Sequence, residues 1–597
     1  MNRCEWNLAP LFANDDDPRM KKARKIVEQK SYAFINAWKD RTDYLRNPVI
    51  LRKALDAYEE WKRYYGTEGD EGYYFWLRTS QDQNNPSLKA KFNLIEQFSR
   101  KIQNDIQFFP LRIAKVSERV QQMFVRHPAL EKYRHYLERL FAESKYLLSE
   151  PEERIINLKS STAYANWVKM TSSFLAKEER MVISESGRMN KKSFSEVASL
   201  MNSRQKKVRD SAAAAFNDVL KKHVDVAEAE INSVLANKQV DDELRGLPRP
   251  DSARHISDDI ETDIVDTLIE TVAGRFDISR RYYALKARLL GVRKLAYHER
   301  NVEYGTISSR FGYQNSLKLI RKVFGNLDQT FAEILDRFIQ NGQFDVYPRK
   351  GKAGGAFCAH NLITQPTYIL LNHTNRLNDV LTLAHELGHA MNNELIKEKQ
   401  HSLYFGTPIS TAEVASTFME DFVLQEIRKN ADDDMRLSIM MMRMNDEVST
   451  IFRQVACYQF ERELHEQFRR KGYLSKHDIG LLFQQHMRSY MGKSVEQSPG
   501  SENWWVYWGH IRSFFYVYSY ASGLLISKSL QNSVKQDPSF IGKVKEFLAA
   551  GLSESPRNIF RRLGIDITRR QFWNRGLAEV ETLLDETTRL AGKLNKI

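Results

Sequence analysis

Apolar residues recur at intervals of three and four along most of the chain, which is the spacing of one helix face. Between residues 128 and 147, for example, Leu130, Leu137 and Phe141 line one such face, and Pro128 suits its first turn. The same spacing predicts further amphipathic helices over residues 31–65, 88–125 and 196–235. The chain is therefore expected to be mainly α-helical.

Cap and breaker residues divide these helices. Ser149 and Glu152 have the spacing of a capping box and predict the start of a helix. The GLPRP stretch at 246–250 must end one, because proline and glycine interrupt helical hydrogen bonding. We place a boundary between 200 and 250 and divide the chain into an N-terminal helical region, 1–200, and a second region, 201–597.

Residues 345–371 have strand rather than helix character. Short β-prone runs such as TYILL alternate there with turn residues and predict a small sheet. Gly354 and Gly355 either lie open as a strand edge or make a turn, and the pattern leaves both readings open. Asn375 is expected to cap the helix that follows.

The charge balance adds little to this picture. Lysine and arginine exceed aspartate and glutamate by 90 − 76 = 14. Basic and acidic residues are interleaved along the chain, which is typical of a solvated surface. Zinc-finger spacing and a basic recognition helix are both lacking, so nucleic-acid binding is not expected.

Cysteine usage and hydropathy favour a soluble protein in a reducing compartment. Cys4, Cys358 and Cys457 are odd in number and far apart, so a disulfide framework is not expected. The N-terminal residues lack the apolar core of a signal peptide. Since no stretch approaches the roughly 18 apolar residues that span a bilayer, we expect a cytoplasmic protein without membrane contact.

The most informative segment is HELGH at residues 385–389. His385 and His389 project about 40° apart on a helix, so their imidazoles can share one zinc ion. Glu386 lies beside that face, where it can accept a proton from a metal-bound water as general base. The other reading is a helix with two structural histidines, which would still need polar partners if buried.

A catalytic zinc needs a third protein ligand. Asn392 and Leu395 stand where the HExxHxxGxxH pattern requires glycine and histidine, so that class is excluded. We therefore assign the third ligand to Glu413 in the next expected helix, although Ser410 and Glu413 also have capping-box spacing. Glu420, two turns further on, is either an acid that orients a ligand histidine or an ordinary partly buried acid.

Together these segments resemble the M3 family of zinc oligopeptidases, most closely its oligoendopeptidase F branch. The glutamate of AEVAST follows His389 by 24 residues, as in that family. Four other segments agree with the branch: CEWNLAPLFANDDD, GKAGGAFC, PTYILLNHTNRLNDVLTLAHELGHA and FFYVYSYASG. The resemblance covers most of the chain and is densest over residues 345–525.

The resemblance implies a mainly α, two-lobed helical zincin with a deep substrate channel and a small β-sheet next to the HExxH helix. It implies that residues 201–597 form the catalytic region and that each chain binds one Zn²⁺. The implied ligands are His385, His389 and Glu413, with Glu386 as the base. Manganese or cobalt could take the place of zinc in such a site.

The resemblance also implies that a histidine and tyrosines near the C-terminus bind substrate and stabilise the oxyanion. In this sequence the histidine is His510. Tyr516 and Tyr520 share a helix face and are the favoured tyrosines, whereas Tyr518 points about 160° away and is a weaker substrate-binding candidate. Packing of these aromatic rings in a core is the alternative for each of them. Gly354 and Gly355 are candidates for pairing with the substrate backbone.

The sequence therefore predicts a zinc-dependent endopeptidase that hydrolyses internal peptide bonds of short unstructured oligopeptides. The alternative is a catalytically inactive peptide-binding protein of the same fold. Such a protein usually lacks the base or a ligand, and this chain retains Glu386 and all three candidate ligands. The oligomeric state is not predicted.

Overall fold

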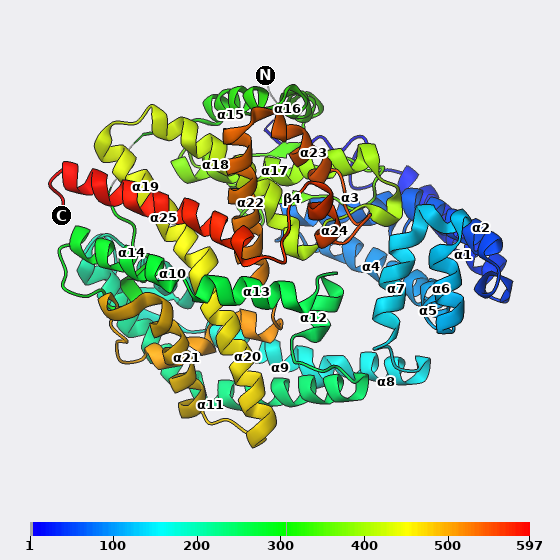
Figure 1. Ribbon diagram of the computed structural model, residues 1–597, viewed down its shortest axis with the longest axis horizontal. Coiled ribbons are helices and arrows are strands. Elements are labelled where there is room, and N and C mark those ends of the chain that lie inside the picture. The colour runs from blue at the N-terminus through cyan, green and yellow to red at the C-terminus, as the bar shows by residue number, and fades with distance from the viewer. Residues whose placement is uncertain (1–3, 306, 308) are drawn as a thin grey trace. The chain divides into compact units, whose positions relative to one another are not determined.

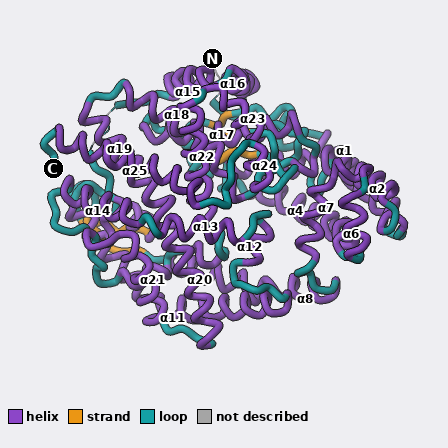
Figure 2. The backbone as a smooth tube through the Cα atoms, viewed as in Figure 1, coloured by secondary structure: helices purple, strands orange, loops and turns teal. Residues whose placement is uncertain are grey.

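The computed structural model describes residues 4–305, 307 and 309–597. Helices make up most of the chain and strands are few and short, as Figure 2 shows. The chain divides into two compact units, each assembled from three separate stretches of sequence. The first unit comprises Met1–Lys145, Ser308–Lys429 and Leu530–Ile565, and the second comprises Tyr146–Ile307, Asn430–Ser529 and Asp566–Ile597.

The first unit contains one small sheet, which α16 (Gln329–Asn341) precedes and α17 (Leu377–Lys399) follows in sequence (Figure 1). Its strands are β3 (Phe344–Asp345), β4 (Phe357–Ala359) and β5 (Tyr368–Leu370). Its helices are α1 (Arg19–Trp38), α2 (Pro48–Tyr64), α3 (Gly69–Gln81), α4 (Pro86–Ile106), α5 (Phe108–Ala114), α6 (Glu118–Arg126), α7 (Arg134–Ser144), α15 (Tyr313–Leu327), α16 (Gln329–Asn341), α17 (Leu377–Lys399), α18 (Ala412–Lys429), α23 (Ile541–Leu548) and α24 (Pro556–Arg562).

The second unit is built around a long helix and carries a two-stranded antiparallel hairpin, β1 (Glu179–Ile183) and β2 (Met189–Ser193). Its helices are α8 (Glu150–Ser160), α9 (Asn166–Ala176), α10 (Phe194–Leu200), α11 (Lys206–Arg245), α12 (Ser252–Ser257), α13 (Thr262–Ala273), α14 (Phe276–Leu289), α19 (Asp433–Glu447), α20 (Gln454–Lys471), α21 (Lys476–Met491) and α25 (Arg570–Lys593). The division between the units falls within α22 (Tyr518–Gln536).

Aromatic side chains from the N-terminal part of the chain pack against the sheet of the first unit. The strand order is β3-β5-β4, with β3 parallel and β4 antiparallel to the central strand. The indole of Trp6 donates a hydrogen bond to the Ile369 carbonyl of β5 at 2.9 Å, and Tyr73 donates to the Ala359 carbonyl of β4 at 2.9 Å. These aromatic side chains share one buried cluster with Tyr368, so residues distant in sequence form a single core here.

Helix α17 carries the HELGH segment and packs against β4, β5 and α18. Its first turn is closed by Asp379, which accepts hydrogen bonds from the backbone N–H groups of Thr374 and Arg376 at 2.7 and 2.8 Å. Lys397 and Lys399 lie in its last turn, where positive charge is favoured by the helix dipole. The predicted sheet next to the HExxH helix is confirmed.

Most predicted helices are present, with different boundaries. The capping box of Ser149 and Glu152 opens α8 as expected, and Gly246, the first residue of GLPRP, ends α11 in a left-handed conformation. The expected helix over 31–65 is interrupted at 39–47, because Asn47 and Pro48 start a new helix there. The prediction for Asn375 is wrong: it has a φ of 67°, and Arg376 is the cap residue.

Candidate metal centre

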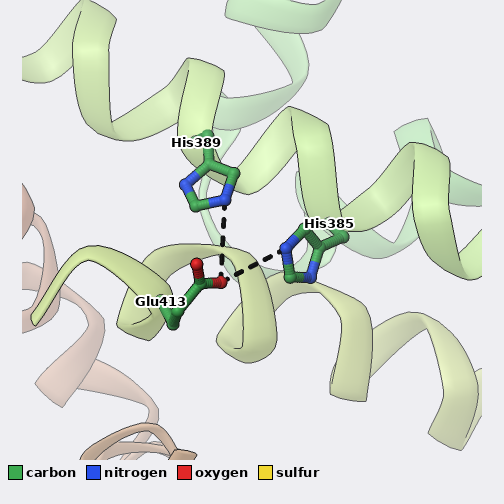
Figure 3. Close-up of side chains that lie close together, drawn as sticks. All are labelled: His385, His389 and Glu413. Atoms are coloured by element: carbon green, nitrogen blue, oxygen red, sulfur yellow. Dashed lines mark ion pairs between the residues drawn. The ribbon is translucent and has the colours of Figure 1, made fainter. Parts of the chain in front are cut away.

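Three polar side chains from α17 and α18 converge within the first unit (Figure 3). His385 and His389 are one turn apart on α17, and Glu413 lies in the first turn of α18. Glu413 Oε2 is 3.3 Å from His385 Nε2 and 3.7 Å from His389 Nε2. One ligand atom from each side chain lies within 4.8 Å of the other two. The structure therefore brings together the three residues that the sequence analysis proposed as ligands.

Gly388 allows α18 to approach α17 this closely. A Cβ atom at this position would lie 2.5 Å from Ser416 Cα and 2.6 Å from the Ala415 carbonyl oxygen, both backbone atoms of α18. Any side chain would therefore force the two helices apart, and Glu413 with them. The sequence analysis assigned no role to Gly388. A glycine in the middle of a buried helix was the available signal, because glycine lowers helix stability and needs another reason to be there.

Charge is distributed unequally over the three candidate ligands. Burial disfavours a charged His385, but Glu413 and Glu420 outweigh it and raise the pKa of this imidazole to about 10. Burial and the nearby His385 lower the pKa of His389 to about 4. Burial also opposes charge on Glu413, yet its contacts with the two histidines lower its pKa to about 2. A bound metal ion would replace the proton on His385, since metals bind deprotonated ligands.

Two further side chains of α18 orient this group. Glu420 Oε2 lies 3.1 Å from Nδ1 of His385, the nitrogen that does not face Glu413. The Ser416 hydroxyl donates a hydrogen bond to Glu413 Oε2 at 3.0 Å. An orienting role was one of the two alternatives left open for Glu420 from its place two turns beyond Glu413, and the contact with His385 favours it. Ser416 was not predicted.

Glu386 is buried beside the candidate ligands, with only 7% of its surface exposed. Burial raises its pKa to about 7, against the effects of the nearby His385 and of a hydrogen bond from the Cys358 backbone. Cys358 belongs to β4, so the carboxylate lies where α17 packs against the sheet. A carboxyl group whose pKa is near neutrality can both accept and release a proton.

The two glycines proposed for substrate pairing form a bend, and the strand begins at Phe357. Gly355 has a left-handed φ of 73°, and its carbonyl accepts a hydrogen bond from Asn372 at 2.8 Å. The strand-edge alternative is therefore wrong for Gly354 and Gly355 themselves. Both glycines are exposed and have open space above Cα. Within the described residues, β4 is one of the two edge strands of this sheet and pairs with β5 alone.

His510, Tyr516 and Tyr520 form a group of their own in the second unit. Tyr516 is hydrogen-bonded to His510 Nδ1, and the two ring centroids are 5.2 Å apart. The ring of Tyr520 is 6.0 Å from His510 and 5.9 Å from Tyr516. Burial, followed by the contact with Tyr520, raises the pKa of Tyr516, so its hydroxyl stays protonated as a donor.

Tyr518 lies away from this group. Its side chain is fully buried in the second unit, and its hydroxyl donates a hydrogen bond to Asp258 Oδ2 at 2.7 Å. The sequence analysis ranked Tyr518 behind the other two tyrosines on helical geometry. Its surroundings lend no support to direct contact with a substrate.

Asp210, His298 and Glu299 form the other cluster of potential ligands found among the described residues. Lys206 lies 3.0 Å from Asp210, and Arg209 lies 2.7 Å from Glu299. Two cations therefore already neutralise these carboxylates, and the donor set does not suit a metal ion. We regard it as an ion-pair cluster of the second unit.

The donor set on α17 and α18 does suit zinc. Tetrahedral zinc with bonds of 2.0–2.1 Å places its ligand atoms about 3.3 Å apart. The distances of 3.3 and 3.7 Å from Glu413 to the two imidazoles are close to that value. Two imidazole nitrogens and a carboxylate oxygen are also the donors of a common catalytic zinc site, which keeps its fourth position open.

A helical body whose HExxH helix meets a glutamate from the next helix defines a metallopeptidase. The model of peptidase family M3 matches residues 199–579, and the Oligopeptidase F model matches residues 112–177. The chain thus belongs to peptidase family M3 and is a metalloendopeptidase acting on oligopeptides. Its family is in general zinc-dependent.

Relatives of similar length agree with this membership. The chain is 24% identical to an oligoendopeptidase F homolog of Borreliella burgdorferi over 95% of this chain and 94% of the relative. It is 24% identical to the oligopeptidase PepF of Bacillus subtilis, over 99% and 88%. The crystal structure of oligoendopeptidase-F from Enterococcus faecium has the same fold, with a TM-score of 0.71 at 18% identity over 96% and 99% of the chains.

The structure also bears on two further predictions, one on membrane-spanning helices and one on the division of the chain into regions. Among the described residues, none of the helices has the length and apolar character needed to cross a membrane. The boundary between regions 1–200 and 201–597 stays a prediction, because the compact units are interleaved in sequence rather than consecutive.

Proposed function

We propose that this protein is a zinc-dependent endopeptidase that hydrolyses internal peptide bonds of short, unstructured oligopeptides. The observation that carries the proposal is the convergence of His385, His389 and Glu413, with the buried carboxyl group of Glu386 beside them. The names of the relatives, oligoendopeptidase and oligopeptidase, support the substrate class.

His385, His389 and Glu413 would hold one zinc ion per chain, and Glu420 would hold the ring of His385 in place through Nδ1. When bound, zinc supplies Lewis-acid chemistry, polarising the scissile carbonyl and making an attacking water more acidic. The carboxylate of Glu386 accepts a proton from that water and then delivers it to the leaving amine.

Two further groups of residues are candidates for contact with a substrate. The edge strand β4 is a candidate for backbone pairing with an extended peptide, next to the bend at Gly354 and Gly355. His510 and Tyr516, with Tyr520 in contact, offer donors of the kind that stabilise a developing oxyanion. Their role rests on the family resemblance and on their mutual contacts. The cytoplasmic location and the absence of nucleic-acid partners stay predictions.

The substitution Glu386→Gln tests the proposal. It removes the proton acceptor and leaves the three candidate ligands unchanged, so we expect the loss of peptide hydrolysis with full zinc content. The measurements are zinc by atomic absorption and cleavage of a quenched-fluorescent peptide of about ten residues. Glu394→Gln is the matched control, since Glu394 lies on the same helix but bonds to Thr367 and Lys397.

Three outcomes would contradict the proposal. Activity that survives in Glu386→Gln would exclude this residue as the base. Zinc-loaded wild-type protein that binds peptides without cleaving them would favour the inactive peptide-binding alternative. Cleavage of folded proteins as fast as short peptides would exclude the proposed substrate class.

A second substitution tests the ligand assignment. Glu413→Ala removes the carboxylate that links the two imidazoles, so we expect the purified variant to lack zinc. Full zinc occupancy in this variant would remove Glu413 from the ligand set.

A further inference from the structure

The segment that carries His510 and Tyr516 contains an unusual turn. Phe514 and Phe515 are consecutive and both have left-handed backbones, with φ of 50° and 59°. Residues with a Cβ atom rarely adopt this conformation, and bulky ones adopt it only where their surroundings impose it. Tyr516 follows the turn directly, so the turn determines where its hydroxyl points.

Two polar side chains hold the backbone of this turn. The Phe515 N–H donates a hydrogen bond to Glu461 Oε1 at 2.9 Å. Arg254 donates from Nε to the Phe514 carbonyl and from Nη2 to the Ser513 carbonyl, each at 3.1 Å. Glu461 is fully buried on α20, and Arg254 belongs to α12. Three successive residues are therefore fixed from two separate helices.

Packing restrains the same turn. The side chain of Phe515 is fully buried, with its ring 4.9 Å from His465 and 5.7 Å from Tyr458. His465 and Tyr458 also lie on α20, the helix of Glu461. A swing of the Phe515 backbone to an ordinary conformation would remove this ring from its site, so packing and hydrogen bonding favour the same geometry.

The flanks of the turn are anchored as well. On the N-terminal side, Arg512 pairs with Glu230 through two hydrogen bonds of 2.6 and 2.9 Å, and both side chains are buried. On the C-terminal side, Tyr518 donates to Asp258, which lies 3.5 Å from Arg254. The fully buried Tyr518 thus acts as an anchor. Tyr516 lies between the two anchors in sequence, and it stays half-buried together with its hydrogen-bond partner His510.

We infer that Arg254 and Glu461 are positioning residues for hydrolysis: they hold the left-handed Phe514–Phe515 turn and thereby fix the Tyr516 hydroxyl against His510. The inference rests on the proposed function, in which Tyr516 and His510 act on the substrate. Neither positioning residue needs to touch the peptide. Their effect falls on the chemical step, because a displacement of about 1 Å in a donor costs up to about 100-fold in rate.

The test compares two substitutions of Glu461. Glu461→Ala leaves the Phe515 N–H without an acceptor, whereas Glu461→Gln keeps an oxygen in place. For Glu461→Ala we expect kcat to fall about 10- to 100-fold, with KM changed less than about 3-fold and zinc content unchanged. Glu461→Gln should restore kcat to within about 3-fold of wild type. Glu463→Ala is the control, since Glu463 lies on the same helix and contacts His486.

Hydrogen exchange of the Phe515 amide gives a readout that is independent of activity. We expect protection in the wild type and in Glu461→Gln, and fast exchange in Glu461→Ala. If Glu461→Ala does not fold, Arg254→Lys tests the positioning role instead. Lysine has one donor atom in place of the two nitrogens that bind Ser513 and Phe514. We expect a lower kcat and an unchanged KM for that variant.

Several results would overturn the inference. Wild-type kcat in Glu461→Ala or in Arg254→Lys would exclude a positioning role. A loss in Glu461→Gln as large as in Glu461→Ala would mean that the carboxyl group acts other than by accepting the hydrogen bond of the Phe515 N–H. A wild-type protein that hydrolyses no peptide would refute the proposed function instead, and the amide exchange would then still test the restraint on the turn.

Discussion

The imidazole of His385 is held at both of its nitrogens. Nε2 lies 3.3 Å from Glu413 and Nδ1 lies 3.1 Å from Glu420, so the two carboxylates of α18 fix the plane of the ring. A carboxylate on the distal nitrogen of a ligand histidine sets its tautomer and strengthens it as a donor to the metal. Nε2 of His389 lies further from Glu413, at 3.7 Å, so the two candidate ligands are held differently.

We predict that Glu420→Ala lowers zinc affinity about 10- to 100-fold. The ring of His385 would lose the partner that orients it, while all three candidate ligands stay in place. Competition with a chelator measures the affinity, and hydrolysis at saturating zinc should be affected less. Glu426→Ala is the control, since Glu426 lies on the same helix and pairs with Lys322 at the surface. Equal zinc affinity in both variants would exclude this role for Glu420.

At the residue scale, the sequence predicted best the site residues whose positions follow from the geometry of one helix. His385, Glu386 and His389 follow from one motif, and Glu413 follows from the need for a third ligand outside that helix. Helical geometry also separated Tyr518 from Tyr516 and Tyr520. This argument assumed that all three tyrosines lie on one helix. In the structure α22 begins at Tyr518, so Tyr516 lies outside the helix. The left-handed backbone before Tyr516 could not be predicted, since side chains distant in sequence impose it.

At the element scale, the close approach of α17 and α18 forms the candidate metal centre. The two helices touch at Gly388, because the backbone of α18 occupies the space that a Cβ atom would need at this position. We predict that Gly388→Ala destabilises the protein by about 1–3 kcal/mol through overpacking and also weakens zinc retention. Thermal unfolding with and without a chelator measures both effects.

Gly542→Ala is the matched control for this substitution. Gly542 also lies inside a helix of the first unit, α23, but has open space where a Cβ atom would be placed. Alanine should stabilise that helix by about 0.5–1 kcal/mol. A stable, zinc-loaded Gly388→Ala protein would show that the helices tolerate a wider separation.

The elements themselves were predictable to different degrees. Helices follow from local periodicity, and their breaks from pairs such as Asn47 and Pro48, which the helix expected over 31–65 overlooked. The small sheet was predicted between residues 345 and 371, where it lies. The parallel pairing of β3 with β5 was not, because strands two and three residues long carry no signal for their partners.

At the scale of the whole molecule, a buried cation links stability to pH. Lys286 is fully buried in the second unit, where its amine donates hydrogen bonds to the Arg300 carbonyl and to Asn445 at 2.6 and 2.9 Å. Burial, followed by repulsion from Arg300, lowers its pKa from 10.5 to about 7. The unfolded chain therefore binds more protons than the folded one between these pH values.

Because the folded state lowers the pKa of Lys286, the contribution of this residue to the free energy of unfolding should grow with pH. The free energy of unfolding due to Lys286 should rise between pH 7 and pH 10.5 by up to about 1.4 kcal/mol per pH unit. It is smallest below pH 7, where both states are protonated. The measurement is the difference in Tm between wild type and Lys286→Met across pH 6–10, since methionine does not titrate. A difference that stays constant or falls with pH would contradict the prediction.

The interleaving of the two units bears on how the chain is made. The first unit combines Met1–Lys145 with Leu530–Ile565, and the second ends with Asp566–Ile597, so neither is complete before the last stretches are synthesised. At about 5–20 residues per second, the first stretch waits roughly 20–80 s on the ribosome for its final partner. Aromatic side chains such as Trp6 and Tyr73 emerge long before the strands that cover them. A nascent chain of this topology cannot mature one domain at a time, and its early segments depend on protection from aggregation during translation.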